Sequence, residues 1–244
     1  MTCAVTHTIS WRLIEDPPRS GAENMATDEG LLRDAANGEE VPALRFYTWD
    51  PPAVSLGRFQ DERTAVDARA CRRLGIDVVR RITGGRAVLH HHELTYSIVA
   101  RTDHAIFPNA LLGTYKVIAE GLLAGLGNLG IQAEMVSRSC KNAERIRKRT
   151  SEPACFASPS WYEILVNGKK IIGSAQRRVP GAFLQHGSIL IDRDPSLEAS
   201  VIPGGSGEGV TSIREVLGHA VTTAEVRAEF VRGFSDALRI RFAP

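Results

Sequence analysis

The 244-residue chain has few cysteines, little net charge and no long hydrophobic run. Its four cysteines form no CxxC pair and have no zinc-ligand spacing, so we expect reduced thiols, a cytoplasmic protein and no metal site. No apolar stretch is long enough to span a bilayer, and the first residues lack the basic start and apolar run of a secretory signal. The formal net charge of +2 gives no overall argument for nucleic-acid binding.

What the chain does contain is typical of a globular enzyme. Hydrophobic residues make up 43% and charged residues 24%, and the length suffices for one large core. Apolar spacing and cap residues predict helices at 21–36, 61–74, 109–126 (with Asn109 as the N-cap) and 222–238 (with a capping box of Thr222 and Glu225). β-prone runs predict strands at 44–49, 53–57, 76–81 and 94–99. Without a regular βαβ alternation, the pattern favours an α+β fold with a mixed sheet, as a single domain over residues 1–244.

A thiol and a lysine lie close together in the sequence between residues 155 and 170. Asn167-Gly168 separates two β-prone runs and predicts a hairpin with a type I′ turn, in which both central residues have positive φ. This hairpin places Lys170 opposite Leu165, with Glu163 diagonal on the same face. A thiol is a nucleophile as thiolate, and a nearby cation lowers the pKa of a thiol. Cys155 and Lys170 together therefore indicate acyl transfer through a thioester.

Both residues also have a structural interpretation. Free cysteine usually packs as a small hydrophobic residue, and Lys170 can form an ordinary cross-strand ion pair with Glu163. The strand from Trp161 to Leu165 covers roughly 13 Å, so the loop with Cys155 must fold back over the sheet for the thiol to meet Lys170. The spacing leaves both interpretations open.

A second marked segment runs from residue 80 to residue 90 and reads RRITGGRAVLH. Its glycine pair follows a predicted strand and lets the backbone approach a ligand closely, with amides that can hold an oxyanion or phosphate. The flanking Arg80, Arg81 and Arg86 can bind a carboxylate or phosphate with two-pronged geometry. The alternative is a tight glycine turn with solvated arginines. A Walker A loop is excluded, since no Lys-Ser or Lys-Thr follows.

These segments together resemble the lipoate–protein ligase A and octanoyltransferase superfamily over nearly the whole chain. The matching motifs are RRITGGRAVLH at 80–90, ELTYS at 93–97, CF at 155–156, GKKIIGSAQ at 168–176, QHGS at 185–188 and NMATDE at 24–29. The resemblance implies the biotin/lipoate protein ligase catalytic-domain fold, a mixed and largely antiparallel sheet flanked by helices. It also implies no accessory C-terminal ligase domain.

Within that superfamily the chain is more similar to the LipM-type octanoyltransferases than to the ATP-dependent ligases. Cys155-Phe156 stands before a Pro-Ser-x-Tyr-Glu strand, and TGGR at 83–86 replaces the SGGG typical of the ligases. The resemblance implies octanoyl transfer from acyl carrier protein to Cys155, and then to a lysine of a lipoyl domain or of the glycine-cleavage H protein, in lipoate biosynthesis. No cofactor is expected.

In this interpretation Cys155 is the nucleophile, while Lys170 polarises the thioester carbonyl and takes a proton from the incoming amine. The substrate-binding residues that the resemblance implies are Arg80, Arg81, Thr83, Gly84, Gly85, Arg86, His90, Gly173, Ser174, Ala175, His186 and Gly187. For His186 a hydrogen-bonded structural role is the alternative. The run 90–92 of three histidines is not expected to bind a metal, because neighbouring strand residues point to opposite faces.

Two other functions stay open at this point. One is a short lipoate–protein ligase that needs ATP and Mg and works with a separate partner subunit. The other is a protein without catalytic activity that binds carrier domains. The basic segment 137–150 is either a solvated loop or a docking surface for acidic carrier proteins. Neither nucleic acid nor a membrane is expected as a partner.

Overall fold

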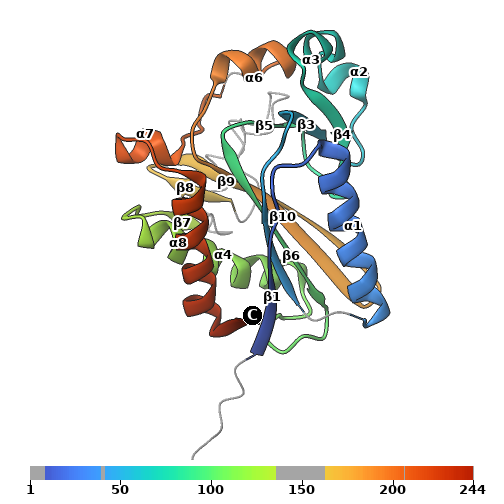
Figure 1. Ribbon diagram of the computed structural model, residues 1–244, viewed down its shortest axis with the longest axis vertical. Coiled ribbons are helices and arrows are strands. Elements are labelled where there is room, and N and C mark those ends of the chain that lie inside the picture. Colours follow the sequence, from blue (N-terminus) through green and yellow to red (C-terminus); the bar gives the residue numbers. More distant parts are fainter. Residues whose placement is uncertain (1–8, 40–41, 136–162, 206, 244) are drawn as a thin grey trace, which may run out of the picture.

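The computed structural model describes residues 9–39, 42–135, 163–205 and 207–243. Within them the largest unit is an eight-stranded mixed sheet (Figure 1). Its strand order is β11-β1-β2-β6-β10-β9-β8-β7. The strands are β1 (Ile9–Glu15), β2 (Ala43–Tyr47), β6 (Glu93–Arg101), β7 (Glu134–Met135), β8 (Ile164–Val166), β9 (Lys169–Val179), β10 (Ala182–Leu190) and β11 (Ile240–Ala243). β1 pairs in parallel with β2 and β11, and the other neighbours are antiparallel, which confirms the expected mixed and largely antiparallel sheet.

A smaller sheet packs beside the first. It contains β3 (Ala53–Leu56), β4 (Asp77–Arg80) and β5 (Val88–His90), in the order β4-β3-β5. The helices are α1 (Gly21–Asn37), α2 (Glu62–Ala65), α3 (Ala68–Leu74), α4 (Leu111–Asn128), α6 (Pro195–Val201), α7 (Ile213–Leu217) and α8 (Thr223–Leu238). α1 contacts strands of both sheets, so it joins the two at the site described below.

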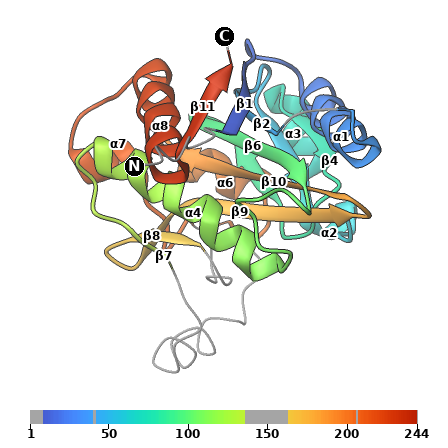
Figure 2. The same cartoon turned by 90° about the horizontal axis from the view of Figure 1, so that it is seen from below.

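Helices cover both faces of the large sheet (Figure 2). α4 and α8 lie on one face over the main core, where Phe234 packs against Phe46 and Tyr96 of the sheet. α1 lies on the other face, where its Leu32 and other apolar residues pack on β6 and β10. Among the described residues, no helix is both long and apolar enough to cross a membrane.

The helices α4 and α8 approach each other closely through glycines. A Cβ on Gly125 would lie 2.7 Å from Cγ of Phe230, and a Cβ on Gly233 would lie 2.4 Å from the backbone nitrogen of Gly125. Real Cβ atoms do not approach so closely, because interiors are close-packed. The glycines at these two positions therefore set the distance between the helices.

Cap residues explain most helix boundaries. Ser20 and Glu23 form a capping box at the start of α1, and Gly38 ends the helix in the left-handed conformation. The predicted box of Thr222 and Glu225 is also confirmed.

Two helix predictions were wrong in detail. Ala110 and not Asn109 stands at the N-cap of α4, because the Asn109 carboxamide oxygen accepts a 3.3 Å hydrogen bond from Arg178 instead. The predicted helix 61–74 is two helices with a break at Val66, which is extended. Asp67 causes the second start, since its carboxylate accepts from the backbone amides of Arg69 and Ala70.

The hairpin at Asn167-Gly168 forms as predicted. Both turn residues have positive φ, 51° and 74°, and the register places Lys170 opposite Leu165. Consecutive side chains on a strand point to opposite faces, so Lys169 is exposed while Lys170 is buried. The hairpin register thus places Lys170, and not Lys169, in the interior.

Candidate functional site

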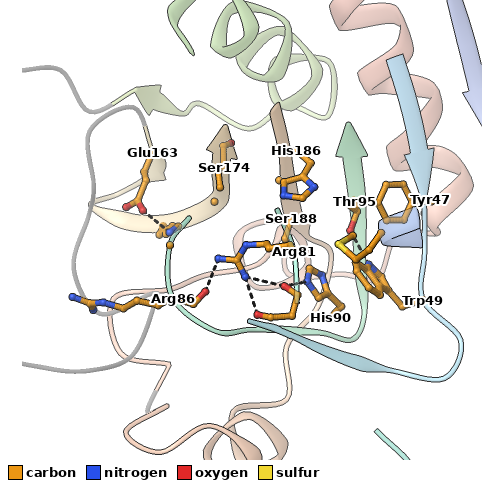
Figure 3. A pocket seen from close by; sticks show the side chains of 17 residues that line it. Tyr47, Trp49, Arg81, Arg86, His90, Thr95, Glu163, Ser174, His186 and Ser188 are labelled. Atoms are coloured by element: carbon orange, nitrogen blue, oxygen red, sulfur yellow. Dashed lines mark hydrogen bonds and ion pairs between the residues drawn. The ribbon is translucent and has the colours of Figure 1, made fainter. Parts of the chain in front are cut away.

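A cavity of about 210 Å³ lies where the two sheets meet (Figure 3). It is lined by Met25, Tyr47, Trp49, Ser55, Arg81, Gly85, Arg86, His90, Thr95, Glu163, Lys170, Gly173, Ser174, Ala175, His186, Gly187 and Ser188. In Figure 3, Glu163 and Ser174 lie on one side of the cavity and Tyr47 and Trp49 on the other. The cavity therefore brings ten of the sequence-predicted site residues together from both sheets. They are Arg81, Gly85, Arg86, His90, Lys170, Gly173, Ser174, Ala175, His186 and Gly187.

Lys170 forms a buried ion pair in the cavity wall. Its Nζ donates to Oε1 of Glu163 over 2.5 Å, and both side chains are about 5% exposed. This is the cross-strand pair that the hairpin register predicts. A buried ammonium ion requires such a partner, because desolvation of an isolated charge is costly. The pair holds a cation at a fixed place beside the cavity.

Small residues of β9 and β10 leave the space that the cavity occupies. A Cβ on Gly187 would lie 2.4 Å from the carbonyl oxygen of Gly173, so a larger residue does not fit there. The Ser174 hydroxyl is hydrogen-bonded to the Tyr96 hydroxyl over 2.7 Å, and the side-chain amide of Gln185 donates to the Tyr96 hydroxyl. Burial raises the pKa of Tyr96 to about 12, which keeps the phenol neutral.

The glycine loop 83–86 is held from inside by Arg81. This buried guanidinium donates to the carbonyl oxygens of Ser55 at 2.8 Å, Gly84 at 2.9 Å and Arg86 at 2.7 Å. These hydrogen bonds fix the loop in the shape that lines the cavity. Both terminal nitrogens of Arg81 therefore donate to protein carbonyl oxygens. The two-pronged geometry that the sequence suggested for a ligand here holds the protein's own loop.

Three other predicted residues of this segment do not line the cavity. Arg80 is exposed, and its guanidinium donates to the carbonyl oxygens of Gly57 at 3.0 Å and Gln60 at 2.8 Å. The Thr83 hydroxyl is hydrogen-bonded to His186, and the Gly84 carbonyl oxygen accepts from Arg81.

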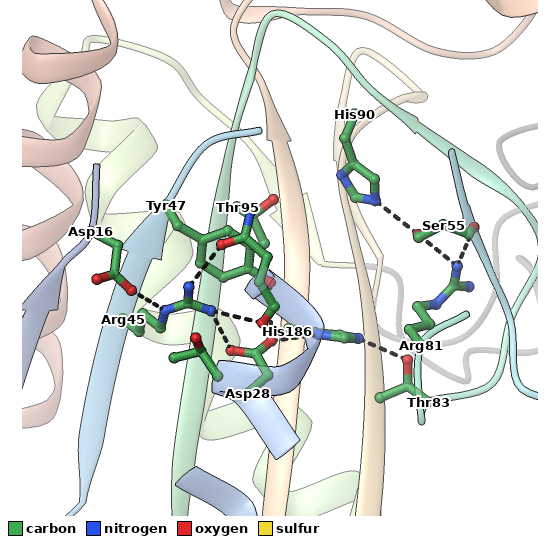
Figure 4. Close-up of polar contacts among 12 residues, drawn as sticks. Asp16, Asp28, Arg45, Tyr47, Ser55, Arg81, Thr83, His90, Thr95 and His186 are labelled. Atoms are coloured by element: carbon green, nitrogen blue, oxygen red, sulfur yellow. Dashed lines mark hydrogen bonds and ion pairs between the residues drawn. The ribbon is translucent and has the colours of Figure 1, made fainter. Parts of the chain in front are cut away.

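His186 is the centre of a buried polar chain (Figure 4). Its Nε2 lies 2.8 Å from the Thr83 hydroxyl, and its Nδ1 lies 3.0 Å from Oδ2 of Asp28 on α1. The other oxygen of Asp28 accepts from Arg45 at 2.8 Å, and Arg45 also donates to Asp16 at 2.6 Å. The chain therefore links α1, β2, β10 and the glycine loop through one histidine.

The chain also fixes charge states. Burial alone would raise the pKa of Asp28, but the hydrogen bond and charge of His186 and the Arg45 guanidinium outweigh it and hold that pKa below its ordinary value. An ionised carboxylate only accepts hydrogen bonds, so Nδ1 of His186 donates to Asp28. His186 thus lines the cavity with both ring nitrogens hydrogen-bonded, and its substrate-binding role stays a prediction.

His90 lies in the wall between the two sheets. Its Nε2 is 2.8 Å from the Ser55 hydroxyl, and its Nδ1 is 3.2 Å from Oε1 of Glu93. Its ring stacks on Trp49, with 4.0 Å between the ring centroids. Burial lowers the pKa of His90, against the opposite effect of Glu93. The imidazole is therefore a neutral, stacked part of the cavity wall.

Several cavity residues carried no role in the sequence-based prediction. They are Met25, Tyr47, Trp49, Ser55, Thr95, Glu163 as a cavity residue, and Ser188. Met25 and the nearby Asp28 belong to the NMATDE motif that supported the family resemblance. Trp49 precedes Asp50-Pro51-Pro52, and this sequence indicates a turn but no role in a site.

Some predicted residues lie outside the described part. These are Cys155 and the basic segment 137–150. Within the described part the single cysteine is Cys71, which is buried in a satellite core and not in the cavity. Among the described residues no group of three or more His, Cys, Asp or Glu side chains could hold a metal ion.

Comparisons with known proteins agree with this geometry. A family model described as the lipoyl protein ligase A/B catalytic domain matches residues 20–235. The proteins named Octanoyltransferase LipM from Brevibacillus brevis and Carboxydothermus hydrogenoformans are 40% and 43% identical to the chain. Each alignment covers 96% of this chain, with 89% and 88% of the respective relative.

Solved structures of ligases share the fold. A crystal structure of lipoate-protein ligase A bound with ATP matches with a TM-score of 0.79 and 26% identity, over 96% of this chain and 87% of that one. A bi-partite lipoate protein ligase from Thermoplasma acidophilum, described with its E2 lipoyl domain, matches with a TM-score of 0.76 and 25% identity, over 96% and 86%.

Proposed function

The chain belongs to the lipoyl protein ligase A/B catalytic-domain family, and from this membership we propose that it is an octanoyltransferase of lipoate biosynthesis that works through a thioester on Cys155. One structural observation supports the proposal most directly. The Nζ of Lys170 is buried in the cavity wall and held by Glu163 at 2.5 Å. A fixed cation at this place suits a reaction in which an acyl carbonyl and a thiolate both develop negative charge.

The proposed first step is attack on the donor thioester. The Sγ of Cys155 as thiolate forms a bond to the octanoyl carbonyl carbon, and the carbon–sulfur bond to the donor breaks. The donor leaves as thiolate and takes up a proton from the Lys170 ammonium group, which leaves Lys170 as a neutral amine for the second step. Lys170 stabilises the oxyanion of the tetrahedral intermediate, because its ammonium group is held in place before the reaction.

The proposed second step passes the acyl group to an amine. A lysine of the acceptor loses a proton and attacks the thioester carbon, an amide bond forms, and the Cys155 thiolate is released. Lys170 is the residue that we expect to accept this proton, since it lies beside the cavity. The energy of the donor thioester drives both steps, so the proposal needs no ATP, metal or other cofactor.

The proposed partners are those that the resemblance to the octanoyltransferases implies. The donor is octanoyl-acyl carrier protein, and the acceptor is a lipoyl domain or the glycine-cleavage H protein. The other predicted residues keep their roles as part of the proposal. Gly173, Ser174, Ala175, Gly187, Gly85 and Arg86 form the acyl site. Thr83, Gly84 and Arg80 act from outside the cavity, through their hydrogen bonds to His186, Arg81 and the neighbouring loop. A cytoplasmic location remains part of the proposal.

The test is intact-protein mass spectrometry after mixing the protein with octanoyl-acyl carrier protein in the absence of ATP. The proposal expects one octanoyl adduct, absent in Cys155→Ala and discharged when apo H protein is added. If no adduct forms, and the acceptor is modified only after addition of ATP and lipoate, the protein is a ligase. That rival has support from the shared fold with the lipoate ligases.

A further inference from the structure

Phe59 is far more exposed than any other large hydrophobic residue in the described part of the chain. Its exposed fraction is 85%, while the next values, for Leu74, Leu111 and Leu112, are all close to 44%. Single exposed apolar residues are common on proteins and need no explanation by themselves. Phe59 is different, because its aromatic ring is almost fully exposed on a fixed backbone beside the cavity, and this position calls for an explanation.

The backbone on both sides of Phe59 is fixed by a dense set of hydrogen bonds. Arg80 donates to the carbonyl oxygens of Gly57 and Gln60. The Gln60 side chain accepts from the amide of Gly57 at 2.9 Å, and the amide of Gln60 donates back to the Gly57 carbonyl at 3.0 Å. The amide of Arg58 donates to the carbonyl of Thr83 at 2.9 Å. Because the loop is already ordered, a partner that binds Phe59 loses little free energy to the conformational entropy of the loop.

This loop lies directly against the wall of the cavity. A Cβ on Gly57 would be only 1.9 Å from the carbonyl oxygen of Gly85, so the two backbones touch. Gly85 both lines the cavity and is exposed, so the cavity wall reaches the surface at this point. The loop joins β3 to α2, at the same end of the molecule as the small sheet (Figure 1). Phe59 thus belongs to a loop that packs, through Gly57, against the exposed rim of the cavity at Gly85.

One arginine lies beside the ring. The guanidinium carbon of Arg58 lies 5.5 Å from the centre of the Phe59 ring, and the exposed Arg80 supports the same loop. The nearby exposed Arg63 pairs with Asp61 over 2.9 Å. With Asp61 and Glu62 counted against Arg58, Arg63 and Arg80, these exposed side chains carry a net charge of +1. Aromatic residues and arginine are enriched at protein interfaces and among the residues that dominate binding energy.

We propose that Phe59 and Arg58 form a docking contact for the acidic carrier protein that delivers the acyl group. This inference rests on the proposed function, since a donor that is itself a protein must hold its acyl arm in the cavity while its body lies on the rim. The aromatic ring supplies apolar contact area, and the arginines attract an acidic surface. A small thioester without a protein body makes no such contact.

The experiment compares two octanoyl donors for Phe59→Ala and for the unchanged protein. The donors are octanoyl-acyl carrier protein and octanoyl-pantetheine, and the readout is the rate of adduct formation against donor concentration. We expect the KM for the protein donor to rise at least tenfold, with no change for octanoyl-pantetheine. Arg58→Gln should raise the same KM less and reduce its dependence on salt. Leu111→Ala, a change at another exposed apolar residue, is the matched control and should change neither KM.

Several results would overturn the docking contact. An equal rise of KM for both donors would mean that Phe59 covers the acyl group itself. No rise for either donor would remove any role in donor binding, and a defect only in discharge to the acceptor would assign the surface to the acceptor. Direct titration with octanoyl-acyl carrier protein separates docking from chemistry. If the unchanged protein forms no adduct, the proposed function fails, while weaker binding by Phe59→Ala would still support the contact and equal binding would overturn it.

Discussion

Lys170 and Glu163 are both buried, and each is the charge partner of the other. Removing one charge of such a pair leaves the other desolvated, which typically costs about 3–5 kcal/mol, whereas removing both is often close to neutral. This asymmetry lets the structural and the chemical role of Lys170 be measured separately.

We predict that Lys170→Met loses about 100-fold or more in the rate of octanoyl transfer, and also loses stability to urea. The double variant Lys170→Met/Glu163→Gln should regain stability, because no buried charge is left alone, but should stay inactive. Lys169→Met is the control, since that neighbour is exposed. Recovery of activity in the double variant would show that the lysine is needed for folding only.

A second prediction concerns the hydroxyl of Thr83, which lies 2.8 Å from Nε2 of His186. Thr83→Val keeps the shape but leaves this buried nitrogen without its partner, so we expect the free energy of unfolding to fall by about 1–3 kcal/mol. Thr83→Ser keeps the hydroxyl and should retain most of the hydrogen bond. Urea unfolding of both variants at pH 7 gives the comparison. Equal losses for Val and Ser would mean that the methyl group, and not the hydroxyl, matters.

At the scale of elements, the turns and caps were predictable because their signals are local. The turn at Asn167-Gly168 requires positive φ at two neighbouring positions, and the side chains of Thr222 and Glu225 accept from each other's backbone amides. The break at Val66 was missed although Asp67 is a good N-cap residue, because the apolar spacing continues across it. The position of Asn109 depends on Arg178 of a distant strand, which no local pattern contains.

The contact of α4 with α8 gives an element-scale prediction. Gly125→Ala should lower the free energy of unfolding by about 1–3 kcal/mol, because the added Cβ would lie 2.7 Å from Cγ of Phe230. Gly127→Ala in the same helix has no atom within 4 Å of its Cβ, so it should stabilise by up to about 1 kcal/mol. Thermal or urea unfolding measures both. A loss at Gly127 as large as at Gly125 would show that helix spacing is not the cause.

At the scale of the whole molecule, the cavity exists only after both sheets and α1 have come together. The sequence indicated Lys170 and the glycine loop, since each belongs to a motif with its own chemistry. It gave no role to Tyr47 or Trp49, because their place in the wall depends on β2 packing beside β6 and on the small sheet. Long-range strand order of this kind is not contained in short motifs.

His90 connects the two sheets, because its ring is hydrogen-bonded to Ser55 of the small sheet and to Glu93 of the large one. The protonation of His90 therefore affects the stability of this contact between the sheets. Its pKa is lowered in the folded protein, so the unfolded state binds more protons below about pH 6.5. The free energy of unfolding should therefore fall as the pH is lowered from 7.5 to 5.5. One such histidine contributes at most about 1.4 kcal/mol per pH unit.

The measurement is urea unfolding at several pH values in this range. His90→Gln should flatten the dependence on pH, since glutamine does not titrate. His219→Gln, which removes an exposed imidazole, is the matched control. A slope in His90→Gln as steep as in the unchanged protein would place the acid sensitivity at other residues.

The two-residue turn at Asn167-Gly168 has one more consequence. Lys169 and Lys170 are chemically identical neighbours, and the pleat of β9 sends one to solvent and the other to the cavity. One additional residue in the turn that shifted the pairing by one position would bring Lys169 to the cavity and move Lys170 to the buried place of Ile171. The length of the turn thus sets which lysine faces the cavity. Point substitutions along the strand do not change that length, so they do not test this effect.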